Sequence, residues 1–260
     1  MNTQPNQIPI KTPEEIATMR EGGKILAECL KLTAEKALPG TSTIELDQFA
    51  EEFIRNHDAT PSFKGYHNYP ATLCTNINEQ VVHAIPSPNQ ILKEGDIIAI
   101  DCGCYYKGFH TDSTVLLGVG PEDQLSSEKA RLIQAAEKVL SKAENFLKDG
   151  VYLNDLCELI GRTITKKGYS VVEELTGHGI GLRLHEPPHI PNQKESHGKG
   201  PLLKAGMTLA IEPIFTAGSG RIKTLNDKWT IVTADNSLAV QIEHTFLITV
   251  TGCEVLTRRL

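Results

Sequence analysis

A weak internal repeat constrains the fold of this chain more than any other feature of its sequence. Residues 92–101 and 203–212 both read L-K-x-G-x-x-x-A-I followed by an acidic residue, at an offset of 111 positions (from 92 to 203). Residues 40–46 and 150–156 resemble each other at an offset of 110 (from 40 to 150). Chance similarity between short apolar segments is the alternative. The offset exceeds a solenoid repeat, so a true duplication predicts two halves of one domain packed about a pseudo-twofold axis.

Helix signals precede each copy of the repeat, which favours duplication over chance. Residues 12–15 (T-P-E-E) can form a capping box with proline at the first helical position, and this helix should end before residues 39–40 (P-G). A second capping box over residues 42–45 opens another helix. Two more helices flank residues 149–150 (D-G). Segments rich in β-branched residues predict strands over 97–101, 113–119, 207–213 and 239–250.

Length and composition favour one globular domain. The 260 residues suffice for a buried core, and 40% hydrophobic with 22% charged residues is ordinary for a soluble protein. We expect residues 1–11 to form a flexible arm and residues 12–260 a single domain, with pseudo-halves at about 12–120 and 121–256. The net charge of −6 disfavours nucleic-acid binding as a main function. Basic pairs such as Arg258-Arg259 are interpreted as solvated surface charges.

The start of the chain and its cysteines bear on where the protein resides. The first residues contain no signal sequence, and no run of about 18 apolar residues occurs that could span a membrane. We therefore expect a cytoplasmic protein that does not enter a membrane. In that compartment the six cysteines are expected to be reduced. Cys102 and Cys104 form a C-x-C pair without a second pair, which argues against a thiolate zinc site.

Each repeated strand ends in a carboxylate, Asp101 in the first half and Glu212 in the second. A carboxylate that closes an apolar strand is poorly solvated unless a cation meets it. The segment from Asp101 to Asp112 resembles a hairpin that turns near Lys107-Gly108. Such a hairpin would place Asp112 beside or diagonal to Asp101, within roughly 5–8 Å. Two ordinary acids, one of them near a turn, are the alternative.

Two further residues extend this set. Glu243 lies inside the apolar segment 239–250, where a lone acid is costly unless the strand is an exposed edge. His178 lies among glycines in residues 176–181 (T-G-H-G-I-G), which leaves the imidazole accessible and does not match a phosphate-binding loop. A histidine of the core or surface is the alternative. Two Asp, two Glu and one His together suit a pair of Mn, Fe(II), Co or Zn ions.

Asp101, Asp112, His178, Glu212 and Glu243, in this order, resemble the metal ligands of the methionine aminopeptidases. Their surroundings match the same family: D-C-G-C-Y-Y-K-G-F-H-T-D-S-T, G-H-G-I-G-x-x-x-H-E-x-P, G-M-T-x-x-I-E-P and I-E-H-T. The resemblance runs from about residue 12 to 256. It implies the α+β pita-bread fold, a curved, mainly antiparallel sheet with helices on its outer face and two pseudo-symmetric halves. The short stretch between His178 and Glu212 indicates the type I form.

The resemblance implies a role for each ligand. The cofactor would be two divalent ions, Co, Mn, Fe(II) or Zn. Asp101 would chelate one ion, Asp112 and Glu243 would bridge both, and His178 and Glu212 would bind the other. Glu212 would also be the general base for the bridging water.

Two histidines and a side-chain pocket are implied as well. His83 would assist proton transfer to the leaving nitrogen, and His185 would stabilise the carbonyl oxygen as charge develops on it. Surface loop histidines are the alternative for both. The methionine side chain would enter a compact apolar pocket. Its lining, for which ordinary core packing is the alternative, is implied to include Phe63, Tyr66, Tyr69, Cys74, Leu184 and Trp229.

The implied activity is removal of the N-terminal methionine from nascent proteins by attack of a hydroxide bound to two metal ions. A small, uncharged second residue would be preferred. The implied partners are the N-termini of nascent polypeptides near the ribosome exit, and we expect a monomer without direct contact to nucleic acid. Three positions depart from the family pattern and bear on substrate range: Ala84, Thr111 and Leu184. Ala84 is expected to narrow the substrate site by one methyl group.

Three other functions are compatible with parts of the sequence. An exopeptidase of the same fold that cleaves Xaa-Pro bonds usually carries a separate N-terminal domain, for which the position of Asp101 leaves no room. A binding module on this fold typically loses metal ligands, whereas all five are kept here. A hydrolase with a serine nucleophile would need a G-x-S-x-G elbow, which is not present.

Overall fold

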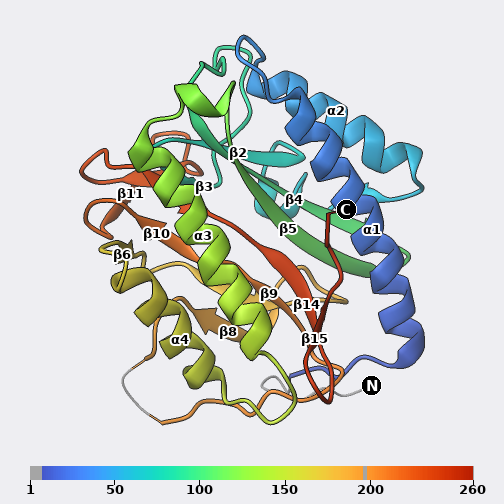
Figure 1. Ribbon diagram of the computed structural model, residues 1–260. Helices are drawn as coiled ribbons and strands as arrows, with labels where there is room; N and C mark the ends of the chain where they lie inside the picture. Colours follow the sequence, from blue (N-terminus) through green and yellow to red (C-terminus); the bar gives the residue numbers. More distant parts are fainter. Residues whose placement is uncertain (1–7, 196–197, 260) are drawn as a thin grey trace.

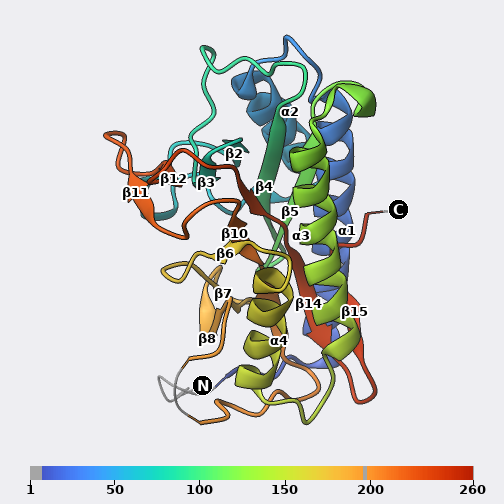
Figure 2. The ribbon, with the colours of Figure 1, turned by 60° about the vertical axis from the view of Figure 1, so that its left-hand side comes forward.

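Four α-helices cover one side of a curved set of antiparallel strands (Figures 1 and 2). The structure is a computed structural model that describes residues 8–195 and 198–259. The helices are α1 (Pro13–Lys36), α2 (Thr43–Asn56), α3 (Ser127–Phe146) and α4 (Leu153–Thr165), with the short 3-10 helices η1 (Tyr66–Asn68) and η2 (Glu122–Gln124). The strands are β1 (Thr60–Pro61), β2 (Leu73–Ile77), β3 (Gln80–Val82), β4 (Ile97–Tyr106), β5 (Phe109–Gly118), β6 (Ser170–Val171), β7 (Thr176–Gly179), β8 (Glu186–Pro191), β9 (Thr208–Ile211), β10 (Ile214–Thr216), β11 (Ile222–Thr224), β12 (Ile231–Thr233), β13 (Ala239–Gln241), β14 (His244–Ile248) and β15 (Cys253–Val255).

The predicted helix starts are confirmed. Thr12 accepts a hydrogen bond from the backbone of Glu15, and the Glu15 carboxylate accepts one from the backbone of Thr12. Ser42 and Glu45 form the second capping box at the start of α2. Reciprocal capping satisfies backbone donors that a helix leaves open at its first turn.

Among the described residues, the two largest sheets have four and five strands. In the first, the order is β1-β4-β2, with β5 also paired to β4; in the second, it is β15-β14-β9-β7-β8. Lys107 and Gly108 both have positive φ, 45° and 96°, which allows the tight turn between β4 and β5. The predicted strand over 239–250 is interrupted: β13 and β14 flank Glu243, whose backbone bridges to Thr114 of β5 instead. This bridge joins the two halves.

Matching contacts relate the halves. Helices α1 and α2 precede β4 as α3 and α4 precede β9. The helix pairs pack on separate core clusters, one beneath α1 and α2 and the other beneath α3 and α4. Equivalent backbone hydrogen bonds recur in the two halves. Gly40 N donates to Leu92 O (2.8 Å) in the first half, as Gly150 N donates to Leu203 O (2.9 Å) in the second. Likewise, Gly95 N donates to Val119 O (2.9 Å), as Gly206 N donates to Ile248 O (2.9 Å). The predicted fold class is therefore confirmed.

The segment before α1 differs from a loose arm where the structure describes it. Residues 1–7 of the predicted arm lie outside the described residues. Lys11 is buried, its backbone N–H donates to Gly206 O at 2.8 Å, and its ammonium group contacts Glu186. No helix among residues 8–195 and 198–259 is long and apolar enough to cross a bilayer.

Candidate active site and metal centre

The β4–β5 hairpin brings two predicted ligands together. Asp101 pairs in register with Thr114, and Asp112 pairs with Gly103. The two aspartates are therefore diagonal neighbours, and strand alternation puts both side chains on the same face of the hairpin. The expectation drawn from the turn at Lys107-Gly108 is confirmed.

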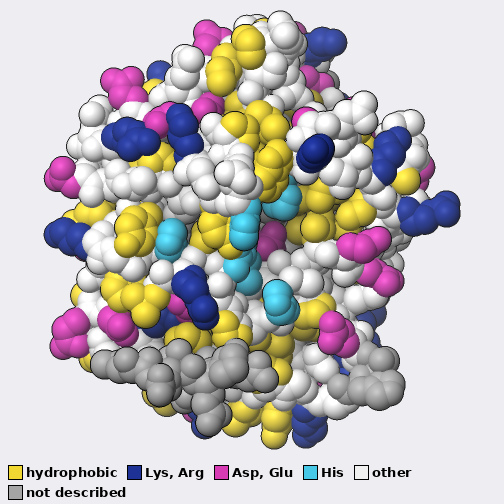
Figure 3. All heavy atoms as spheres, turned by 180° about the vertical axis from the view of Figure 1, so that it is seen from behind, with side chains coloured by type: hydrophobic (Ala, Val, Ile, Leu, Met, Phe, Trp, Pro, Cys, Tyr) yellow, Lys and Arg dark blue, Asp and Glu magenta, His cyan; other side chains and the backbone are white. Residues whose placement is uncertain are grey.

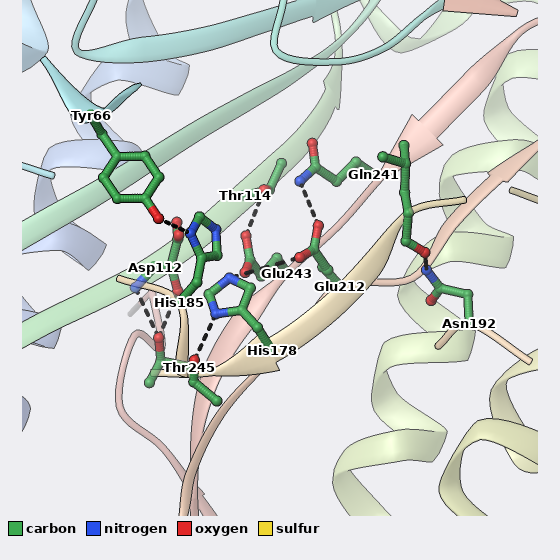
Figure 4. Close-up of polar contacts among 12 residues, drawn as sticks. Tyr66, Asp112, Thr114, His178, His185, Asn192, Glu212, Gln241, Glu243 and Thr245 are labelled. Carbon is green, nitrogen blue, oxygen red and sulfur yellow. Dashed lines mark hydrogen bonds and ion pairs between the residues drawn. The ribbon is translucent and has the colours of Figure 1, made fainter. Parts of the chain in front are cut away.

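The second half supplies the other three residues. His178 lies on β7 opposite Ala210 of β9, Glu212 follows the end of β9, and Glu243 lies between β13 and β14. Ligand atoms of Asp112, His178 and Glu243 all lie within 4.8 Å of one another, and His178 Nε2 is 3.9 Å from Glu212 Oε1. Figure 4 shows these side chains converging from different strands. The five predicted ligands are separated by up to 142 positions in the chain (from 101 to 243).

Several carboxylate oxygens in this cluster lack a hydrogen-bond partner that would stabilise their negative charge. Asp101 Oδ1, Asp112 Oδ1 and Glu243 Oε1 are buried and find no hydrogen-bond partner among the described residues. Burial raises the pKa of Asp101 to about 7, and it raises the pKa values of Asp112, Glu212 and Glu243 well above their usual range. Neighbouring carboxylates raise the pKa values of Asp112, Glu212 and Glu243 further. Such a group needs protons or cations, so these residues fit a divalent metal.

His178 is held as a neutral imidazole. Its Nδ1 lies 2.8 Å from the carbonyl oxygen of Gly179, which can only accept, so Nδ1 carries the proton. The lone pair of Nε2 then faces Glu212. Burial, followed by the nearby His185, lowers the pKa of His178 to about 3, which keeps the imidazole uncharged. A neutral imidazole fixed through its other nitrogen is the form that binds metals.

Polar residues that sequence reasoning missed hold the carboxylates. Thr114 Oγ1 donates to Glu243 Oε2 at 3.1 Å, and Gln241 Nε2 donates to Glu212 Oε2 at 3.3 Å. Thr114 and Gln241 each lie two positions from a predicted ligand. The two-residue period of a strand could therefore have found them.

A cavity of about 310 Å³ adjoins the cluster. It contains both predicted histidines and all six predicted pocket residues, and Asp101 links it to the carboxylates. Figure 3 shows histidine side chains around this hollow, with an acidic side chain at its floor. His67, from the exposed turn η1, also lines it and was missed. The complete lining is Phe63, Tyr66, His67, Tyr69, Cys74, His83, Asp101, Leu184, His185 and Trp229.

The cavity histidines have distinct surroundings. His83 adopts a left-handed backbone conformation with φ of 59°, and its ring meets Trp229 edge to face. Burial lowers the pKa of His83. His185 Nδ1 lies 2.8 Å from the hydroxyl of Tyr66, and its ring centroid is 4.3 Å from that of His178. Burial also lowers the pKa of His185, to about 4, so both cavity imidazoles are neutral near pH 7.

The three departures from the family pattern fall in different places. Ala84 is buried outside the cavity lining, and its carbonyl accepts the Tyr69 hydroxyl at 3.2 Å. The expectation that its methyl group narrows the site is wrong, because that methyl does not reach the cavity. Thr111 is buried near Gly22 of α1, on the side of β5 opposite Asp112. Leu184 lines the cavity.

Comparisons with known proteins agree with this geometry. The sequence profile of metallopeptidase family M24 matches residues 17–250. A protein of Clostridium perfringens named methionine aminopeptidase is 46% identical over 248 residues, which cover 95% of this chain and 98% of that protein. The crystal structure of methionine aminopeptidase from Thermotoga maritima has a TM-score of 0.94 and 38% identity, covering 97% of this chain and 100% of that one. The chain therefore belongs to metallopeptidase family M24.

Within that family, the resemblance to methionine aminopeptidases that the motifs indicated is confirmed. A prolidase from Pyrococcus horikoshii has a TM-score of 0.77 at 23% identity, which shows a shared fold alone. The match covers 96% of this chain but 64% of that prolidase.

Proposed function

We propose that the protein removes the N-terminal methionine from newly made polypeptides as a type I methionine aminopeptidase. One observation supports this proposal most strongly. A cavity lined by aromatic rings and a thiol lies beside a buried cluster of carboxylates, and Asp101 belongs to both. A thioether side chain suits the rings of Tyr69 and Trp229 and the sulfur of Cys74. With the side chain placed there, the first peptide carbonyl would lie near the carboxylates.

Five residues would hold two divalent ions, namely Asp101, Asp112, His178, Glu212 and Glu243. Oxygen-rich ligation with one imidazole fits Co, Mn, Fe(II) or Zn. Such ions lower the pKa of a water molecule and polarise a carbonyl group. The orphaned oxygens of three of these carboxylates support this assignment.

Glu212 is the residue best placed to accept the proton of the attacking water. Its Oε2 accepts a hydrogen bond from Gln241, whereas its Oε1 faces His178 and the cluster. An oriented carboxylate with one free oxygen can take a proton and return it to the leaving amine.

The cavity histidines act on the peptide itself. If the Tyr66 hydroxyl donates to His185 Nδ1, then Nε2 carries the proton and can donate to the carbonyl oxygen as negative charge develops on it. His83, on the other wall beside Trp229, assists proton transfer to the leaving nitrogen. A small, uncharged second residue is preferred, and the exposed side chains of Tyr66 and His67, which line the cavity, are candidates for restricting its size.

The proposed substrates are the N-termini of nascent polypeptides near the ribosome exit, met by a monomeric enzyme in the cytoplasm. The formal net charge of −6 supports recognition of peptides rather than nucleic acid.

The experiment that tests this proposal compares Met-Ala-Ser with Leu-Ala-Ser and Lys-Ala-Ser, using metal-loaded protein and Glu212→Gln. We expect release of methionine well above release of leucine or lysine. Glu212→Gln should reduce kcat by about a hundredfold or more, in the range of general acid-base catalysis. Metal content is measured in parallel. Turnover near that of the unchanged protein with both ions retained would refute the role of Glu212, and equal cleavage of all three peptides would refute the methionine preference.

A further inference from the structure

The connection between β7 and β8 carries two cavity residues, Leu184 and His185. It spans residues 180–185, starts two positions after the ligand His178, and includes the exposed Leu182 and Arg183. Gly181 O accepts the backbone N–H of His110 at 2.7 Å, which ties one point of the loop to β5. The position of His185 depends on what fixes the other end of this loop.

Glu186 fixes that end. One of its carboxylate oxygens, Oε1, accepts the backbone N–H of Arg183 at 3.1 Å, so the side chain bridges the loop internally. The other, Oε2, lies 2.7 Å from Lys11 Nζ. Both side chains of this ion pair are only 2% exposed, which means that neither charge is solvated.

Lys11 is itself firmly placed. Its backbone N–H donates to Gly206 O at 2.8 Å, and the next residue, Thr12, caps α1. The lysine stem also lies against the loop. A β-carbon on Gly181 would approach Lys11 Cε to 2.3 Å. The start of α1, the β7–β8 loop and the turn before β9 thus meet at one buried cation.

We propose that Lys11 and Glu186 form a positioning ion pair that holds residues 180–185, and with them the imidazole of His185, in the arrangement the reaction needs. This inference rests on the proposed function for its catalytic readout. Removing the lysine leaves a buried carboxylate without a counter-charge, and such a group moves toward water or takes up a proton. Movement toward water releases the Glu186 contact to Arg183 and displaces the loop.

The test compares Lys11→Met, Glu186→Gln and the double variant Lys11→Met/Glu186→Gln. Lys24→Met is the matched control, because Lys24 pairs with Glu21 at 2.8 Å while the side chains are 70% and 58% exposed. The readouts are kcat and KM on Met-Ala-Ser, metal content, and amide hydrogen exchange of residues 180–185. All are measured well below each variant's Tm.

We expect Lys11→Met to lower kcat by about tenfold with KM changed less than threefold, because displacing His185 affects the transition state more than the side-chain pocket. The double variant should recover kcat to within about threefold of the unchanged protein, since no buried charge remains. Lys24→Met should have no effect. A Lys11→Met variant with a lower Tm but kcat within twofold of the unchanged protein would overturn the proposal and leave a structural role alone.

Hydrogen exchange separates this inference from the proposed function. If the unchanged protein releases no methionine, the proposed function fails, yet the ion pair still predicts faster exchange over residues 180–185 in Lys11→Met than in Lys24→Met. Equal exchange in these two variants would overturn the positioning role. If Lys11→Met does not fold, the same comparison is made with Glu186→Gln, in which Lys11 is left without its carboxylate.

Discussion

Asp101 and Asp112 are diagonal neighbours on β4 and β5, so one hairpin delivers two carboxylates to the same buried point. Glu212 and Glu243 bring two more from the second half of the chain. Burial raises the pKa values of all four, and neighbouring carboxylates raise those of Asp112, Glu212 and Glu243 further. The apolar strands that position these acids also bury them, and buried, ionised carboxylates need cations to compensate their charge.

The first prediction concerns the stability of metal-free protein between pH 6.5 and 8.5. The pKa of Asp101 is about 7 in the folded chain against an ordinary value of 3.8, so the folded state binds more protons than the unfolded state in this window. Stability should then fall as pH rises, by up to about 1.4 kcal/mol per pH unit for each carboxyl that is protonated in the folded state and ionised in the unfolded state. We expect the Tm measured with a chelator to drop by several degrees.

The window is chosen because histidines oppose this trend at lower pH. Burial lowers the pKa of His178 to about 3 and that of His244 to about 3, so acid favours the unfolded state below about pH 6.5. Added Mn or Co should remove most of the decline, since bound cations compensate the ionised carboxylates. A Tm that rises from pH 6.5 to 8.5 in the presence of chelator would contradict this account.

A second prediction concerns metal affinity. His178→Ala should weaken binding of at least one ion by more than about tenfold, because it removes a neutral nitrogen ligand. His189→Ala is the control: His189 pairs with His178 across β7 and β8 but is exposed. Calorimetric titration with metal ions, after a chelator has removed any bound metal, measures the affinity of each variant. Equal affinities in the two variants would show that His178 is not a ligand.

A third prediction isolates the contact between Tyr66 and His185. Tyr66→Phe keeps the ring in the cavity but removes the hydroxyl that lies 2.8 Å from Nδ1. We expect kcat to fall about fivefold with little change in KM, the effect of one neutral hydrogen bond. Tyr152→Phe, at the start of α4, controls for loss of a hydroxyl elsewhere. A change confined to KM would instead indicate that Tyr66 only lines the pocket.

A fourth prediction distinguishes two departures from the family pattern. Ala84→Gly should leave KM within about twofold, with a loss of roughly 0.5–1 kcal/mol in stability from the added backbone freedom. Leu184→Phe should change KM for methionine peptides clearly, because that side chain lines the cavity. Steady-state kinetics on Met-Ala-Ser measure both variants. The reverse pattern would mean that the cavity lining is wrongly assigned.

Local signals predicted much of this structure. The capping boxes at residues 12–15 and 42–45 start α1 and α2, and the turn at Lys107-Gly108 sets the register of the hairpin. These features depend on a few adjacent residues. The motifs around the five predicted ligands also indicated that these side chains come together, although Asp101 and Asp112 lie inside the ten-residue strands β4 and β5 rather than at strand ends.

Features that depend on distant partners were not predictable. The segment 239–250 breaks at Glu243 because its backbone exchanges hydrogen bonds with Thr114 of β5. Arg259 was interpreted as a solvated charge, yet it is half-buried and donates to Ser113 Oγ at 3.0 Å. Lys11 and Glu186 are 175 positions apart, and neither sequence context indicates the other. A pairing of this kind is visible only once the fold is known.

The most direct test of the central claim is metal add-back to chelated protein, with Met-Ala-Ser and Xaa-Pro peptides as substrates. We expect release of free methionine that depends on added Mn, Co, Fe(II) or Zn, with little cleavage of the Xaa-Pro peptides. Absence of methionine release with every metal, in protein shown to bind two ions, would contradict it.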